Sequence, residues 1–148
     1  MTPIWLKPFR HTQEIWKNGK LYLKRYYLLP GTKKLKVHQI LESDKDRHLH
    51  NHPWDFTTIL LSGGYDEERM NNANGDIYTE RHTAPCVLHR TANDYHRLTL
   101  IDGKPVVSLV FTSKKYQNWG FWTEDGHVDH EEYLGVGKVL DFPRVLRA

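Results

Sequence analysis

The chain has 148 residues, of which 39% are hydrophobic, 26% are charged and 12% are aromatic. This length predicts a single domain, and the aromatic content argues against a disordered chain. The formal net charge is only +3, and basic residues are interspersed with acidic ones instead of forming a stripe, so we expect no nucleic-acid partner.

The sequence also predicts where the protein resides. Its single cysteine, Cys86, cannot form an internal disulfide bond, which is typical of a reducing compartment. The first residues lack the apolar core of a signal peptide, and no apolar stretch reaches the length of a membrane span. We therefore expect a cytoplasmic protein without a membrane partner.

Turn residues divide the chain into short segments that have the composition of β-strands. Asn18-Gly19 predicts a first hairpin, because a two-residue hairpin turn needs a positive φ at both positions. Further strands are expected at residues 34–43 and in the segments FTTILLS, GYDEERM, IYTERHT, CVLHR, HRLTLI and PVVSLVFTS. The one place for a brief helix is around residues 130–134. Short strands at this spacing predict an all-β sandwich or barrel.

The expected domain covers residues 1–148 and has three regions. An N-terminal hairpin, residues 1–33, is expected to pack on the barrel. Residues 34–134 would form the barrel core, and residues 135–148 would form a C-terminal tail.

A histidine-rich stretch, RHLHNHPWDF, carries His48, His50 and His52 at every second position. In an extended chain these three side chains would point to the same face. Imidazole is the commonest protein ligand for several transition metals, but two neighbouring ligands alone bind weakly. A further ligand must come from another strand, and His96 begins such a strand. The sequence therefore predicts a metal site built from two separate segments.

The order of these segments resembles the cupin superfamily. HNHPWDFTTILLSG is similar to the first cupin motif, with His50, His52 and Gly63 in matching positions. APCVLHRTANDYH is similar to the second motif, with Pro85 and His96. Over about residues 36–134 the chain resembles a group of small bacterial and phage cupins.

This resemblance implies an antiparallel, RmlC-like β-barrel of the jelly-roll or double-stranded β-helix type, with little helix. It also implies one divalent metal ion at the mouth of the barrel, bound by His50, His52 and His96, and a homodimer. It implies a small-molecule substrate without saying which. Fe²⁺ is the first expectation, and Zn²⁺, Ni²⁺ or Mn²⁺ are alternatives.

One position departs from the cupin pattern. Phe56 stands where the family has a glutamate ligand, which leaves a three-histidine site similar to that of cysteine dioxygenase and related thiol dioxygenases. Asp55 could supply the missing oxygen ligand if the chain bends at Pro53-Trp54. A second register, which uses His48, His50 and Asp55, places the motif glycine too late.

Other side chains near these motifs suit a substrate pocket. Arg47 and Arg97 flank the ligand segments, and a guanidinium fork suits an anionic substrate; Arg97 and Asp55 are the catalytic candidates. The remaining candidates for substrate contact are Trp54, Tyr65, His89 and Trp122. Ligating imidazoles usually donate their second N–H to an oxygen, for which Asp55, Asp94 and Glu67 are candidates. Surface ion pairs and simple core packing are the alternative explanations for all of these residues.

Three functions are compatible with this pattern. The first is an Fe(II) dioxygenase-type oxidoreductase that acts on a small polar substrate. The second is a non-redox metal-dependent isomerase, epimerase or hydrolase. The third is a cupin without catalytic activity that binds a small ligand or a protein. Because one fold supports many activities, the fold alone does not choose among them.

Overall fold

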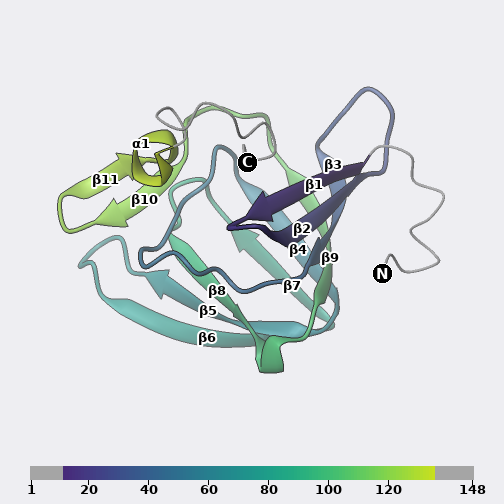
Figure 1. Ribbon diagram of the computed structural model, residues 1–148, viewed down its shortest axis with the longest axis horizontal. Helices are drawn as coiled ribbons and strands as arrows, with labels where there is room; N and C mark the ends of the chain where they lie inside the picture. Colours follow the sequence, from purple (N-terminus) through teal and green to yellow (C-terminus); the bar gives the residue numbers. More distant parts are fainter. Residues whose placement is uncertain (1–11, 136–148) are drawn as a thin grey trace.

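The computed structural model describes residues 12–135, in eleven strands and a short helix (Figure 1). The strands are β1 (Thr12–Lys17), β2 (Lys20–Tyr27), β3 (Leu35–Ile40), β4 (Phe56–Ser62), β5 (Gly64–Met70), β6 (Ile77–Thr83), β7 (Cys86–Arg90), β8 (His96–Leu100), β9 (Val106–Thr112), β10 (Gly120–Thr123) and β11 (Gly126–Asp129). A 3₁₀ turn, η2 (Ile101–Gly103), joins β8 to β9, and helix α1 (His130–Leu134) follows β11. The expected all-β fold and the brief helix are confirmed. Residues 1–11 of the expected N-terminal region and residues 136–148 of the expected tail lie outside the described residues.

The strands form two antiparallel layers. One sheet has the order β1-β2-β3-β9-β4-β7, and the other has the order β6-β5-β8. His50 extends the second sheet, because it forms isolated bridges with His96 of β8 and with Phe121 in the β10–β11 hairpin. Figure 1 shows the two layers arranged around a common interior. This is the cupin-like antiparallel barrel that the sequence predicts.

Glycine and asparagine fix two of the turns. In the β1–β2 turn, Asn18 and Gly19 have φ values of 51° and 76°, as a type I′ hairpin requires. Strand β2 then pairs with β3, so the N-terminal hairpin continues the larger sheet. Gly63, between β4 and β5, has a φ of 79°, and a Cβ at this position would lie 2.7 Å from the Pro105 carbonyl oxygen. Only glycine fits there without displacing the backbone.

Alternation along the strands separates the barrel interior from its surface. In β8 the side chains of His96, Leu98 and Leu100 are buried, whereas Arg97 is half-buried and Thr99 is exposed. The interior is filled by the fully buried side chains of a cluster that includes Ile15, Leu60, Val106 and Phe121. Burial of each large apolar side chain contributes about 1.5–3 kcal/mol to folding. This core holds the two layers together.

One part of the fold was not predicted from the sequence. Strands β10 and β11 form a hairpin around the Thr123–Gly126 turn, where Gly126 has a φ of 89°. The segment is short and polar, with an exposed Trp122, so it lacks an alternating apolar pattern. The bridge between His50 and Phe121, which is a long-range contact, helps to hold this hairpin in place. Within residues 12–135, no helix is long and apolar enough to cross a membrane.

Candidate metal centre

Three imidazoles from two distant segments meet inside the barrel. One ring nitrogen from each of His50, His52 and His96 can be chosen so that all three lie within 4.8 Å of one another. The ring centroids are 4.8–5.1 Å apart. Reciprocal backbone hydrogen bonds join the first and last of these residues: His50 N donates to His96 O (2.9 Å), and His96 N donates to His50 O (2.8 Å). The two sequence motifs are therefore brought together by strand pairing.

The histidine-rich segment is not the continuous strand that its alternation suggests. Only His50 forms bridges, so the expected common face of three imidazoles does not exist. The His48 ring instead contacts Tyr133 Oη through Nδ1 (3.0 Å) and the Glu124 carboxylate through Nε2 (3.1 Å). The expectation that His48 points the same way as the other two is wrong, because the chain leaves the strand conformation on both sides of a single bridged residue.

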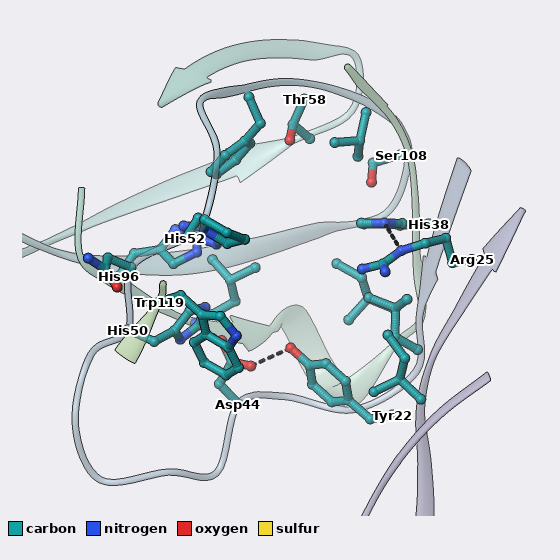
Figure 2. A pocket seen from close by; sticks show the side chains of 18 of the residues that line it. Tyr22, Arg25, His38, Asp44, His50, His52, Thr58, His96, Ser108 and Trp119 are labelled. Atoms are coloured by element: carbon teal, nitrogen blue, oxygen red, sulfur yellow. Dashed lines mark hydrogen bonds between the residues drawn. The ribbon is translucent and has the colours of Figure 1, made fainter. Parts of the chain in front are cut away.

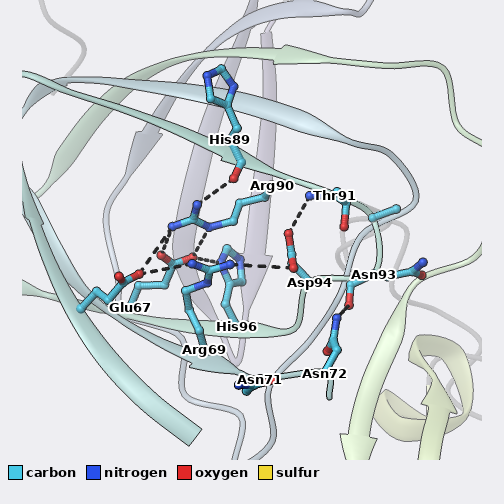
Figure 3. Close-up of polar contacts among 12 residues, drawn as sticks. Glu67, Arg69, Asn71, Asn72, His89, Arg90, Thr91, Asn93, Asp94 and His96 are labelled. Carbon is cyan, nitrogen blue, oxygen red and sulfur yellow. Dashed lines mark hydrogen bonds and ion pairs between the residues drawn. The ribbon is translucent and has the colours of Figure 1, made fainter. Parts of the chain in front are cut away.

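A buried carboxylate orients one of the three rings. Glu67 on β5 is 1% exposed, and its Oε2 accepts a hydrogen bond from His96 Nδ1 (2.6 Å) (Figure 3). The same carboxylate accepts from Arg90 Nη2 (2.6 Å) and Nε (3.1 Å) and from His82 Nε2 (3.0 Å). An ionised carboxylate only accepts, so His96 carries a proton on Nδ1, and the neutral form of this ring has its lone pair on Nε2. Glu67 thus has the role that was predicted for one of three acidic residues.

The protonation states around the site favour neutral imidazoles and an ionised glutamate. Burial, followed by repulsion from the neighbouring histidines, lowers the pKa of His50 and of His52 well below the usual value. Burial alone would raise the pKa of Glu67, but hydrogen bonds from His96 and Arg90 and their charges hold it well below its usual range. Neutral imidazoles present the lone pairs that a metal ion requires.

The residues present fit a divalent transition metal. His52 Nδ1 is buried and has no hydrogen-bond partner in the part of the chain that the structure describes. A buried ring nitrogen without a hydrogen bond destabilises the fold. A metal ion bound to this nitrogen would remove that cost. Phe56 packs against His52 with ring centroids 4.6 Å apart, so an apolar ring and not a carboxylate lies beside this imidazole. The donor set is therefore three nitrogens.

A cavity of about 130 Å³ lies beside the three imidazoles, between the two layers (Figure 2). Figure 2 shows the histidines on one side of it and Arg25 with His38 on the other. The remaining polar side chains of its wall include Tyr22, Asp44, Thr58 and Ser108. Among the residues predicted to contact substrate, Trp54 and Tyr65 line this cavity. The site can therefore hold a metal ion and a small polar molecule together.

Asp55 lies outside this cavity. Its Oδ1 accepts hydrogen bonds from Ala92 N (2.8 Å) and Tyr116 Oη (2.6 Å), and these bonds lower the pKa of the carboxyl. The chain does bend at Pro53-Trp54, but it directs the Asp55 carboxylate toward the loop before β8. The structure therefore does not bring Asp55 to the histidines as a ligand or a catalytic group.

The two arginines chosen from the sequence also point away from the cavity. Arg97 donates to Glu68 and to the carbonyl oxygens of Asp46 and Arg47, and it sits on the outer face of β8. The Arg47 side chain is 79% exposed and pairs with Glu124. Alternation explains the position of Arg97, since it follows the inward-facing His96 on β8.

The other two predicted contacts lie on the outside as well. His89 Nδ1 is bonded to Thr57 Oγ1 (2.8 Å) on the outer face of the larger sheet. Trp122 is 43% exposed and contacts the Tyr95 ring. The sequence analysis missed Arg25 and His38, which alternate inward on β2 and β3. Both residues could have been found from the period of two along these strands, which places every second side chain toward the interior.

Lys36 is a basic residue buried inside the barrel, with 2% of its surface exposed. Its Nζ donates a hydrogen bond to Thr112 Oγ1 (3.2 Å) and lies 4.5 Å from the centre of the Trp54 ring. Burial, with a smaller effect of Arg25 and Lys33, lowers its pKa to about 7. In the unfolded chain the Lys36 ammonium keeps its proton up to a pH of about 10.5. Burial of the charged ammonium therefore destabilises the fold most below pH 7, and this destabilisation decreases as the pH rises from 7 to 10.5.

We expect Lys36→Met to be more stable than the wild type at pH 6, by on the order of 3 kcal/mol or less, because the variant has no ammonium group to bury. The advantage should shrink steadily between pH 7 and pH 10. Urea denaturation of both proteins across this range measures it. The exposed Lys34→Met variant is the control and should follow the wild type. A constant difference at every pH would show that burial of the charge is not responsible.

Solved structures with related folds include several cupins. The Fe(II) form of HppE aligns with a TM-score of 0.55 at 12% identity, over 70% of this chain and 56% of that one. The cupin domain of Drosophila melanogaster CENP-C aligns with a TM-score of 0.53 at 8% identity, over 69% of this chain and 75% of that one. A candidate mannose-6-phosphate isomerase of Ralstonia eutropha JMP134 aligns with a TM-score of 0.50 at 23% identity, over 65% of this chain and 88% of that one.

These similarities concern the fold. The chain spans little more than half of the HppE chain that it matches. Searches with protein-family models and among curated proteins found no match. The paired layers, the strand order and the neighbours agree with one another, and the fold of this chain is that of the cupins.

Proposed function

We propose that this protein binds one divalent metal ion through His50, His52 and His96 and that it is an oxidoreductase of the dioxygenase type. The observation that carries the proposal is the cluster of three imidazoles inside the barrel, with no carboxylate among the candidate ligands and a cavity for a small polar molecule beside it. Fe(II) is the ion that we propose. The Fe(II) form of HppE, a protein of the same fold, supports this choice.

Fe(II) bound by three neutral nitrogens would supply open coordination positions for a substrate and for dioxygen, together with the electrons that reduce dioxygen. The protein's own residues do the rest. Glu67 holds the His96 ring in one orientation and keeps its proton on Nδ1. Phe56 covers the side of His52, which keeps water away from that part of the site. The cavity wall then positions the substrate beside the ligands.

A second function is favoured by another neighbour. The candidate mannose-6-phosphate isomerase aligns over 88% of its own chain, and its identity of 23% is higher than that of HppE or of the CENP-C domain. A non-redox enzyme of this kind would use the ion to polarise an oxygen of its substrate and would not consume dioxygen. The two functions therefore differ in an observable that needs no knowledge of the physiological substrate.

Nitric oxide tests the proposal, because it binds Fe(II) where dioxygen would bind. We expect the protein loaded anaerobically with Fe(II) to give the high-spin EPR signal of an iron–nitrosyl, in proportion to its iron content. The His52→Ala variant is the control and should give only the signal of free iron. An iron-loaded wild type without this signal would contradict an open Fe(II) site. Iron binding without oxygen uptake, tested with a panel of small hydroxy and amino acids, would favour the non-redox function.

A further inference from the structure

A buried arginine faces the cavity from the side opposite the three histidines. Arg25 lies on β2, is 6% exposed and lines the cavity wall. Figure 2 shows it beside His38, across the cavity from His50, His52 and His96. Neither residue belongs to the motifs that resemble other cupins.

Both hydrogen bonds described for Arg25 go to neutral partners. Its Nε donates to His38 Nε2 (2.9 Å), and its Nη1 donates to Gln13 Oε1 (3.1 Å). Because His38 Nε2 accepts this bond, the imidazole carries its proton on Nδ1 and is uncharged. Burial, and then the charge of Arg25, lower the pKa of His38 well below its usual value, in agreement with this assignment. These contacts fix the guanidinium in place without neutralising it.

The acidic residue of the cavity wall is already engaged elsewhere. Asp44 accepts hydrogen bonds from Tyr22 Oη and from Leu98 N (2.8 Å). None of the ion pairs formed within residues 12–135 includes Arg25 or Lys36. A buried charge without a counter-ion costs several kcal/mol. The Arg25 guanidinium thus has no ion-pair partner among the described residues and is suited to bind an anion that enters the cavity.

The indole N–H of Trp119, in the cavity wall, is a second donor that lacks a hydrogen-bond acceptor among the described residues. Trp119 is 4% exposed and lines the cavity, and its Nε1 has no hydrogen-bond partner among the described residues. An indole N–H can only donate, so its partner must carry a lone pair. Arg25 and Trp119 thus both require an acceptor, and both lie on the wall of one cavity of about 130 Å³.

We propose that Arg25 binds the negatively charged group of a small organic anion and that this anion is the substrate of the metal site. The charged group is an oxyanion, either a carboxylate or a phosphate, whose oxygens accept from the free edge of the guanidinium. The small cavity limits the molecule to a few carbon atoms. This inference rests on the proposed function only in calling the anion a substrate, because the binding step needs no metal.

The experiment follows the Arg25 side chain directly. Metal-free protein labelled with ¹⁵N-arginine is titrated with acetate, with inorganic phosphate and with uncharged acetamide, and the arginine Nε–H resonances are recorded by NMR. The Arg25 resonance is the one that is missing from the spectrum of Arg25→Lys. We expect it to shift and to saturate with at least one of the two anions, and acetamide should leave it unchanged. The anion with the higher affinity identifies the charged group.

Two variants define the specificity of this response. Arg25→Met should weaken anion binding, measured by calorimetry, by roughly 10- to 100-fold, which is the value of a charged hydrogen bond. Arg97→Met is the matched control, because Arg97 faces outward, and it should bind the anion like the wild type. An Arg25 resonance that does not respond to either anion in the wild type would overturn the proposal, even if Arg25→Met fails to fold. Loss of binding in Arg97→Met would overturn it as well.

Metal uptake, measured separately on the same protein preparation, separates this inference from the proposed function. Anion binding at Arg25 in a protein that takes up no metal would contradict the metal site and leave the anion site standing. Metal uptake by a protein whose Arg25 resonance does not respond to either anion would contradict the anion site and leave the metal site standing.

Discussion

Replacing His52 by alanine should abolish specific metal binding. Three neutral nitrogens without a carboxylate leave no spare ligand, so removal of one leaves a pair that binds weakly. The loss of affinity should exceed the roughly 10- to 100-fold change that is typical when only an outer hydrogen-bond partner of a ligand is removed. Competition with a chelator of known affinity, combined with elemental analysis, measures it. His96→Ala should behave in the same way.

His48→Ala is the matched control for this experiment. It removes an imidazole from the same stretch of sequence, but one that contacts Tyr133 and Glu124 instead of the cluster. We expect its metal content to equal that of the wild type. Equal metal binding by the His52→Ala, His96→Ala and wild-type proteins would refute the site.

The second large effect is expected at Glu67. Glu67→Gln keeps the shape of the side chain but removes the charge that pairs with Arg90 and orients His96. Breaking a buried pair of this kind costs about 3–5 kcal/mol, because the remaining charge loses its partner. The change should also lower metal affinity by roughly 10- to 100-fold, because the His96 ring is no longer held in one tautomer.

Both consequences are measured on one preparation, by urea denaturation of the metal-free protein and by chelator competition of the loaded protein. Glu68→Gln is the control, since Glu68 is the next residue of β5 and pairs with the outward-facing Arg97. Its stability should change by less than about 1 kcal/mol, because the Glu68–Arg97 pair is partly exposed to solvent and such pairs contribute little. A Glu67→Gln protein with unchanged stability and unchanged metal affinity would contradict the role given to this carboxylate.

The strands could be predicted because their signals are local. The segments FTTILLS, GYDEERM and IYTERHT became β4, β5 and β6 with the same boundaries, since β-branched residues and flanking glycines define where each strand begins and ends. The resemblance to cupin motifs selected His50, His52 and His96, and these rings do converge. The two motifs meet because His50 forms an isolated bridge with His96 of β8.

Other parts of the site depend on which way a side chain faces, and the sequence near the motifs does not determine this. Arg97 and Arg47 are next to ligand segments in the chain, yet they face outward, whereas Arg25 is far from them in sequence and faces the cavity. The choice between these arginines depends on which strands form the opposite wall. The bend after His52 similarly directs Asp55 to Ala92 and Tyr116. Proximity in sequence was therefore a poor guide to proximity in the cavity.

The most direct test of the account is an anomalous difference map from crystals of the metal-loaded protein, recorded at the absorption edge of the metal. The account predicts one strong peak, about 2.0–2.2 Å from a ring nitrogen of each of His50, His52 and His96. A peak bound by other residues, or none at these rings in crystals of protein shown to contain one metal ion per chain, would contradict it.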